Sequence, residues 1–316
     1  MRFSAMGAGR ARMLVAAGAL VLAGLVAGVT SAQAGTYDDP FFLGWSTFLP
    51  ALSSDFTAST ETDCMRGSVH CVDKVIREMT QRYNTLGCDH SSMFAFTYLV
   101  TTEEYRKAVA DPAFFQDNAF VNHQDAVFGD FYFKAYDAWK KGNIGAVSPA
   151  WRVAFSAADR QEVSGMGNVL LGMNAHVNRD LPFVLDAIGL TKPDGTSRKP
   201  DHDKVNTFLN AVNQYLLTEA ARYLDPTVDD GDVPGTSIDN STMVQLLVSW
   251  REAAWRNAER LAQAGSAAAR AQVAQQIEDA AAYTALTLRA SYLYNGVTTG
   301  TAAARNLYCA SHRVSR

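Results

Sequence analysis

The chain has 316 residues, with 28 Lys and Arg against 32 Asp and Glu, and a formal net charge of −4. This acidic balance argues against nucleic-acid binding, which depends on a basic face that displaces phosphate counterions. The length suits one large domain or two small ones, and because no linker-like stretch divides the chain we expect one.

The first 34 residues have the three parts of a secretory signal peptide. Three arginines precede an apolar run over 13–29, and a small-residue A-x-A cleavage site ends at Ala34. We therefore expect a secreted protein that begins near Gly35, carries a net charge of −7 and has no stable membrane span. An uncleaved anchor is the alternative, because the apolar run approaches the length that spans a bilayer.

The mature chain is predicted to be an all-α, single-domain bundle of several helices over 71–316, because its apolar residues recur at spacings of three and four. Residues 35–70, rich in Pro, Ser, Thr and aromatic residues, are expected to form an extended N-terminal arm. The expected helices, with bounds to within a few residues, cover about residues 71–86, 91–110, 112–141, 149–159, 162–179, 182–190, 201–224, 239–263 and 266–295.

Four cysteines lie in the mature chain, and an even number in an exported protein indicates two disulfides. Three pairings are open. We prefer Cys64 with Cys71 and Cys88 with Cys309, because the first two are close in sequence. A zinc-thiolate site is the alternative, although no C-x-x-C spacing occurs.

The helix expected over 112–141 carries His123 and Asp130 two turns apart on one face, beside a stripe of aromatic residues. An acid among so many aromatic residues is either paired or shifted in pKa. A core helix with outward polar residues is the alternative interpretation.

The segment 171–182 places polar side chains in a stretch apolar enough to be buried. His176 and Asp180, at i and i+4, project from one helix face, which suits two ligands of one metal ion or a base and its orienting carboxylate. A core histidine, with Asp180 as the N-cap of a helix that restarts at Pro182, is the alternative interpretation.

Three further polar residues, Asn174, Asn178 and Arg179, accompany this pair. We expect them to orient a substrate or to stabilise negative charge in a reaction. They and the His176–Asp180 pair form the predicted catalytic group.

The helix expected over 201–224 opens with Asp201, a natural N-cap. His202 and Asn206 follow at i and i+4, so both can face the interior from one side of the helix. The sequence allows His202 either to be a ligand of the site or to lie on the surface.

With these residues in place, the chain resembles an uncharacterised bacterial family, a domain of unknown function, over about residues 72–295. The resemblance is carried by FxxxYF at 128–133, LGMNAHVNRDLP at 171–182 and DHxxVN at 201–206. It implies a shared site built from His176, Asp180, His202 and Asn206, without naming a reaction. In helical class and H-x-x-x-D spacing alone, the chain is also similar to all-helical zinc phospholipases C and nucleases.

These observations predict a metal-assisted hydrolase of an ester or phosphoester, with lipids among its substrates. His176, Asp180, His202 and Asp130 or His123 would hold a divalent ion, preferably zinc, that lowers the pKa of a bound water. A non-catalytic protein that binds a small molecule or lipid is the second hypothesis. A metal-free acid–base enzyme using His176 with Asp180 is the third. The chain lacks the G-x-S-x-G, H-E-x-x-H and dinucleotide-binding motifs.

Overall fold

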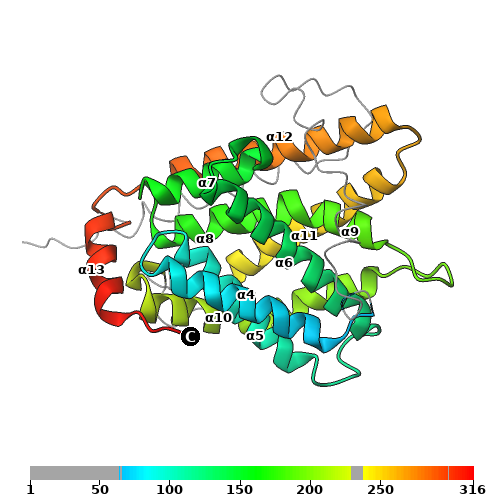
Figure 1. The fold of residues 1–316 in the computed structure, drawn as a ribbon, viewed down its shortest axis with the longest axis horizontal. Coiled ribbons are helices and arrows are strands. Elements are labelled where there is room, and N and C mark those ends of the chain that lie inside the picture. The colour runs from blue at the N-terminus through cyan, green and yellow to red at the C-terminus, as the bar shows by residue number, and fades with distance from the viewer. Residues whose placement is uncertain (1–63, 65, 229–237, 298) are drawn as a thin grey trace, which may run out of the picture. The chain divides into compact units, whose positions relative to one another are not determined.

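In the computed structural model, which describes residues 64, 66–228, 238–297 and 299–316, the regular structure is helical and includes no β-strand (Figure 1). The all-α prediction is confirmed. The predicted signal peptide and the predicted arm up to residue 63 lie outside the described residues.

The helices follow one another with short connections. In chain order they are α4 (Val69–Leu86), α5 (Ser92–Ala108), α6 (Asn118–Lys140), the 3-10 turn η4 (Ile144–Ala146), α7 (Pro149–Asp159), α8 (Gly165–Met173), the π-helix η5 (Asn174–Asp180), α9 (Leu181–Ile188), α10 (Lys199–Tyr223), the 3-10 turn η6 (Pro226–Val228), α11 (Ile238–Ala262), α12 (Ala267–Ser291) and α13 (Ala302–His312).

Helix α6 starts later than predicted, and Asp201 is not the N-cap that the sequence predicts for α10. Helix α6 begins at Asn118 rather than at residue 112, because the Asp117 carboxylate accepts a hydrogen bond from Phe120 N and caps the helix there. Helix α10 begins before Asp201, whose carboxylate instead accepts hydrogen bonds from the backbone N–H groups of Gln116 and Asp117. Asp201 therefore ties α10 to the start of α6.

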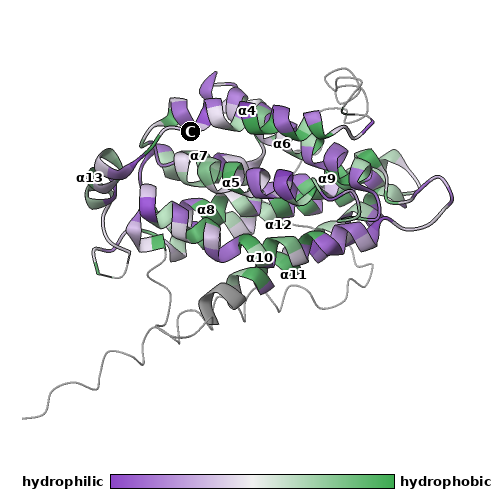
Figure 2. Cartoon of the chain, turned by 90° about the horizontal axis from the view of Figure 1, so that it is seen from below, coloured by the Kyte–Doolittle hydropathy of each residue, from purple (hydrophilic) through white to green (hydrophobic). Residues whose placement is uncertain are grey.

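Helix α5 is buried on most of its circumference, whereas α4 is amphipathic. Packing of α5 against α4, α8 and α10 covers even consecutive residues such as Met93, Phe94 and Ala95, which point in directions about 100° apart around the helix. In Figure 2, green and purple residues mix along α4, as expected for a helix with one buried face. Polar residues of α5 such as Tyr98 consequently lie inside the bundle.

Helices α8, η5 and α9 form one uninterrupted helical run from Gly165 to Ile188. The predicted restart at Pro182, with Asp180 as its N-cap, was wrong: Asp180 makes no capping hydrogen bond. The helix passes Pro182 because the preceding seven residues form a π-helix, whose wider turn has a different hydrogen-bond register from an α-helix.

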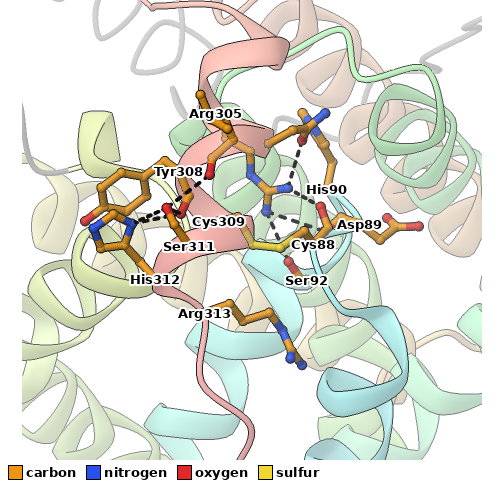
Figure 3. Close-up of a disulfide and its surroundings, with 12 residues drawn as sticks. Cys88, Asp89, His90, Ser92, Arg305, Tyr308, Cys309, Ser311, His312 and Arg313 are labelled. Carbon is orange, nitrogen blue, oxygen red and sulfur yellow. Dashed lines mark hydrogen bonds between the residues drawn. A yellow bond between two sulfur atoms is a disulfide. The ribbon is translucent and has the colours of Figure 1, made fainter.

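Helix α13 was not predicted, and it is held to the start of α5 at the left of Figure 1. Both preferred disulfides, Cys64–Cys71 and Cys88–Cys309, are present. Figure 3 shows that Arg305 reaches from α13 beside the second disulfide. Its guanidinium donates hydrogen bonds to the carbonyls of Cys88 and Asp89 and to Ser92 Oγ.

Within the described ranges, no helix combines the length and the apolar character that crossing a membrane requires.

Candidate functional site

A cavity of about 160 Å³ lies between α5, α6, α8, η5, α10 and α11. Most of its wall is apolar, including Phe94, Phe128, Val169, Met173, Leu216 and Leu217. The polar residues on its wall include Tyr98, Gln124, Asp125, His176, Asn213 and Arg251. An apolar hollow with a few polar groups is the usual form of a small-molecule site.

His176 is the one residue of the predicted site that lines this cavity. Its side chain is 3% exposed, and its ring stacks on Phe128 at a centroid distance of 3.4 Å and an interplanar angle of 6°. Nδ1 lies 3.1 Å from Asp180 Oδ2, and Nε2 has no hydrogen-bond partner among the described residues. The cavity wall therefore contains an imidazole with one nitrogen held and the other unpaired.

The protonation of His176 follows from its surroundings. Burial lowers its pKa, although the Asp180 carboxylate acts in the opposite direction. Because a carboxylate accepts hydrogen bonds, the neutral ring carries its proton on Nδ1 and leaves Nε2 as a base or acceptor.

Asp180 is completely buried, and each carboxylate oxygen has N–H donors. Oδ2 accepts from Trp151 Nε1 at 2.9 Å as well as from His176, and Oδ1 accepts from Arg179 Nη1 at 2.9 Å. With this coordination, Asp180 orients the imidazole and does not itself line the cavity.

Of the other residues predicted to be catalytic, Arg179 and Asn174 join η5 to α12, and Asn178 contacts Asn174 within η5. Arg179 Nε donates to Glu278 Oε1 at 2.7 Å, and Asn174 Nδ2 donates to the carbonyl of Ala281 at 2.8 Å. Asn178 Nδ2 donates to Asn174 Oδ1 at 2.9 Å. None of the three lines the cavity, so the structure places them apart from the unpaired nitrogen of His176.

His202 and Asn206 face inward, as the i and i+4 spacing allows, but they contact Arg251 of α11. His202 Nε2 donates to the Arg251 carbonyl at 3.1 Å. Asn206 Oδ1 accepts from Arg251 Nε at 2.7 Å. Burial and the neighbouring guanidinium lower the pKa of His202 well below its usual value, so this ring is neutral.

His123 and Asp130 lie on α6 without lining the cavity. Asp130 forms an ion pair with Lys134 at 3.0 Å, and burial lowers the pKa of His123. The two residues are not brought to His176 and Asp180 as the predicted metal centre requires.

No group of three or more His, Cys, Asp or Glu side chains in the described part of the chain is arranged to hold a metal ion. Of the predicted ligands His176, Asp180, His202, His123 and Asp130, the structure brings together the first two. Metal-assisted hydrolysis stays a prediction, without a ligand set in the described residues.

The residues that the sequence did not single out are Tyr98, Asp125 and Arg251. Each lines the cavity, and Tyr98 Oη and Asp125 Oδ2 lack hydrogen-bond partners among the described residues. Burial raises the pKa of Asp125 to about 7. Their helices are predicted from periodicity, but no local pattern indicates that three different helices turn these residues toward one space.

The family of unknown function DUF5995 matches residues 72–291, and the chain belongs to this family. The match contains all residues that line the cavity. Comparisons with curated proteins and with solved structures give no match.

Proposed function

We propose that this member of the family binds a small, mostly apolar molecule in the cavity that His176 lines. The observation that carries the proposal is an apolar hollow of about 160 Å³ inside the bundle. A dry engineered cavity of roughly 150 Å³ accommodates benzene, whereas drug-sized ligands need about 300 Å³ or more. The expected ligand is therefore a single-ring compound or a short acyl chain.

Two unpaired polar atoms support a ligand that also carries a polar group. His176 Nε2 and Tyr98 Oη are buried without hydrogen-bond partners among the described residues, and the two rings lie 4.8 Å apart between centroids. Buried polar atoms without partners cost folding free energy, on the order of 1–3 kcal/mol each. A ligand hydroxyl or carbonyl that satisfied either atom would recover part of that free energy on binding.

Calorimetric titration of the purified protein in EDTA with neutral probes, benzyl alcohol and hexanol, tests this proposal. The wild type should bind with saturation. Met173→Trp should abolish binding by filling the cavity, while Leu307→Trp, at a site 75% exposed on α13, should not. Absence of saturable binding to the wild type, or unchanged binding to Met173→Trp, would contradict the proposal.

A second function, metal-free hydrolysis of an ester bound in the same cavity, is favoured by the His176–Asp180 arrangement. A carboxylate on Nδ1 holds the imidazole in the tautomer in which Nε2 can accept a proton from water. The water then attacks the ester carbonyl, and the protonated ring returns the proton to the departing alkoxide.

The hydrolysis proposal is tested with p-nitrophenyl acetate and p-nitrophenyl butyrate in EDTA. His176→Gln should lower kcat by at least about 100-fold, the usual effect of removing a general base. His312→Gln, at an exposed histidine of α13, is the control and should leave the rate unchanged. Equal rates for wild type and His176→Gln would refute a catalytic role and leave the binding proposal intact.

We also propose that the protein is exported. Two disulfides suit folding in an oxidising compartment, and they support the signal peptide predicted over residues 1–34. N-terminal sequencing of protein recovered outside the cytoplasm should begin near Gly35. Recovery of the full-length chain in the cytoplasmic fraction would contradict export.

A further inference from the structure

Arg251 is a buried cation on the wall of the proposed ligand cavity. Its side chain comes from α11, and the residue is 4% exposed. Nε donates to Asn206 Oδ1 at 2.7 Å, and Nη2 donates to the His202 carbonyl at 2.8 Å and lies 3.3 Å from His202 Nδ1. Among the described residues, none accepts a hydrogen bond from Nη1, so that side of the guanidinium has no partner in this part of the chain.

No described carboxylate forms an ion pair with this guanidinium: Asp203 favours its charged form from beyond ion-pair distance and is itself paired with Lys199 at 2.8 Å. Buried Arg179, by contrast, pairs with Asp180 and Glu278 at 2.9 and 2.7 Å. Arg305 is also buried without a carboxylate, but both of its terminal nitrogens have acceptors in the protein. Burial lowers the pKa of Arg251 to about 10, so the side chain is still charged at neutral pH.

The other titratable residues on the cavity wall do not supply the missing negative charge. None of the ion pairs among the described residues joins Asp125 to Arg251; Asp125 Oδ2 has no hydrogen-bond partner there, and burial raises the pKa of this carboxyl group. His176 is neutral and is held by Asp180. Tyr98 keeps its proton, because burial raises its pKa.

We infer that the ligand is a small apolar monocarboxylate whose carboxylate binds the unpaired side of Arg251 while its hydrocarbon part fills the cavity. This inference rests on the proposed binding function and adds the class of ligand. Arg251 is the single Lys or Arg among the described residues of the wall, so one negative charge balances the site and a doubly charged phosphate does not. The planar guanidinium and a carboxylate form short, charge-assisted hydrogen bonds.

His202 and Asn206 thereby acquire a role. They hold Nε and Nη2 of Arg251 in place. The side chain is therefore already in one rotamer, and ligand binding at Nη1 does not cost the conformational entropy of ordering it. A neutral His202 is required for this, because a second cation beside the guanidinium would repel it.

The test is calorimetric titration, in EDTA at constant ionic strength, of two matched pairs: hexanoate with hexanamide, and benzoate with benzamide. The wild type should bind each carboxylate at least about tenfold more tightly than its amide, the effect of one charge-assisted contact. Arg251→Met should lose this preference and still bind the amides. Arg256→Met, at an exposed arginine on the same helix, should retain it.

Arg251→Lys keeps the positive charge. It replaces Arg251→Met in the same titrations if circular dichroism shows that Arg251→Met does not fold. It should retain a preference for the carboxylate at lower affinity, because lysine lacks the guanidinium geometry. Equal binding of amide and carboxylate to the wild type, or a carboxylate preference that persists in Arg251→Met, overturns the inference and leaves the binding proposal. Failure of all four probes to bind the wild type overturns both.

Discussion

At the scale of single residues, the cavity contains ionisable groups in unusual states. Arg251 keeps its charge without an ion-pair partner among the described residues, His176 is neutral despite a carboxylate at 3.1 Å, and Asp125 holds its proton to about pH 7. In each case burial disfavours the charged form, and the neighbouring groups decide how far the pKa moves. Buried ionisable groups with shifted pKa values are frequent in functional sites, because binding and catalysis require charges and protons at set positions.

Asp125 makes the free energy of unfolding depend on pH. The Asp125 carboxyl group loses its proton near pH 4 in the unfolded chain and near pH 7 in the folded chain. The contribution of Asp125 to the free energy of unfolding therefore falls as the pH rises from about 4 to about 7, and it is constant above about pH 7. Asp125→Asn removes the effect. Relative to wild type, the variant should gain on the order of 2–4 kcal/mol between pH 4 and pH 8, with the lower end favoured because Asp125 is partly accessible in the cavity.

Urea unfolding at pH 4, 6 and 8 measures this difference. Asp130→Asn on the same helix is the control: Lys134 pairs with that carboxylate at 3.0 Å, so the substitution should not stabilise the protein. A constant difference between Asp125→Asn and wild type at all three pH values would contradict the raised pKa.

At the scale of elements, the π-helix η5 decides which way the polar motif faces. It packs against α6, α7, α11 and α12. The side chains of Arg179 and Asn174 reach α12, while His176 lines the cavity. π-Helical turns often occur at functional sites, because the extra residue per turn redirects side chains that an α-helix would align.

Gly172, one turn before His176, lets α5 approach this element. A Cβ atom at Gly172 would lie 2.3 Å from the ring of Phe94, which lines the cavity. Gly172→Ala should therefore destabilise the protein by about 1–3 kcal/mol, outweighing the gain of about 1 kcal/mol in helix propensity. It should also weaken binding of benzyl alcohol, because Phe94 must move.

Gly265→Ala is the control for this substitution, since no atom lies within 4 Å of its added Cβ. Its effect on urea unfolding should stay within about 0.5 kcal/mol. If Gly172→Ala and the wild type were equally stable, the ring of Phe94 would be able to move away from the added Cβ atom without loss of unfolding free energy, contrary to this prediction.

At the scale of the whole molecule, the two disulfides restrain very different lengths of chain. Cys88–Cys309 joins residues 221 positions apart, and Cys64–Cys71 joins residues 7 apart. The longer link, with buried Arg305 beside it, holds α13 at the start of α5 (Figure 3). In the chain-entropy account, restraint of the unfolded state grows with the logarithm of loop length.

Replacing both cysteines of a link by alanine should reveal this difference. The Cys88→Ala, Cys309→Ala variant should lose about 5 kcal/mol and the Cys64→Ala, Cys71→Ala variant about 2 kcal/mol, measured by urea unfolding without reductant. All four side chains are buried or nearly so, which makes the two variants comparable in lost packing. A larger loss in the second variant would contradict the entropic explanation.

The sequence by itself determined what depends on neighbours a few residues apart. Helical periodicity predicts the all-α bundle, and the i, i+4 spacing predicts that His176 and Asp180 meet, because helix geometry sets the distance between side chains one turn apart. The even cysteine count predicts two disulfides; the pairing itself was only preferred among three possibilities, and the structure confirms the preferred one. Helix α13 was missed because its buried residues are Arg305 and Cys309, which do not form the apolar stripe from which the other helices were predicted.

Only the tertiary structure decided which polar residues share a space. The sequence allows Arg179 to face the cavity, but its guanidinium donates a hydrogen bond to Glu278 of α12 instead. Arg251 carries no local sign of burial, yet His202 and Asn206 hold it on the cavity wall. The reason is physical: contacts between helices depend on how whole apolar faces pack, and that packing is fixed by side chains distant in sequence.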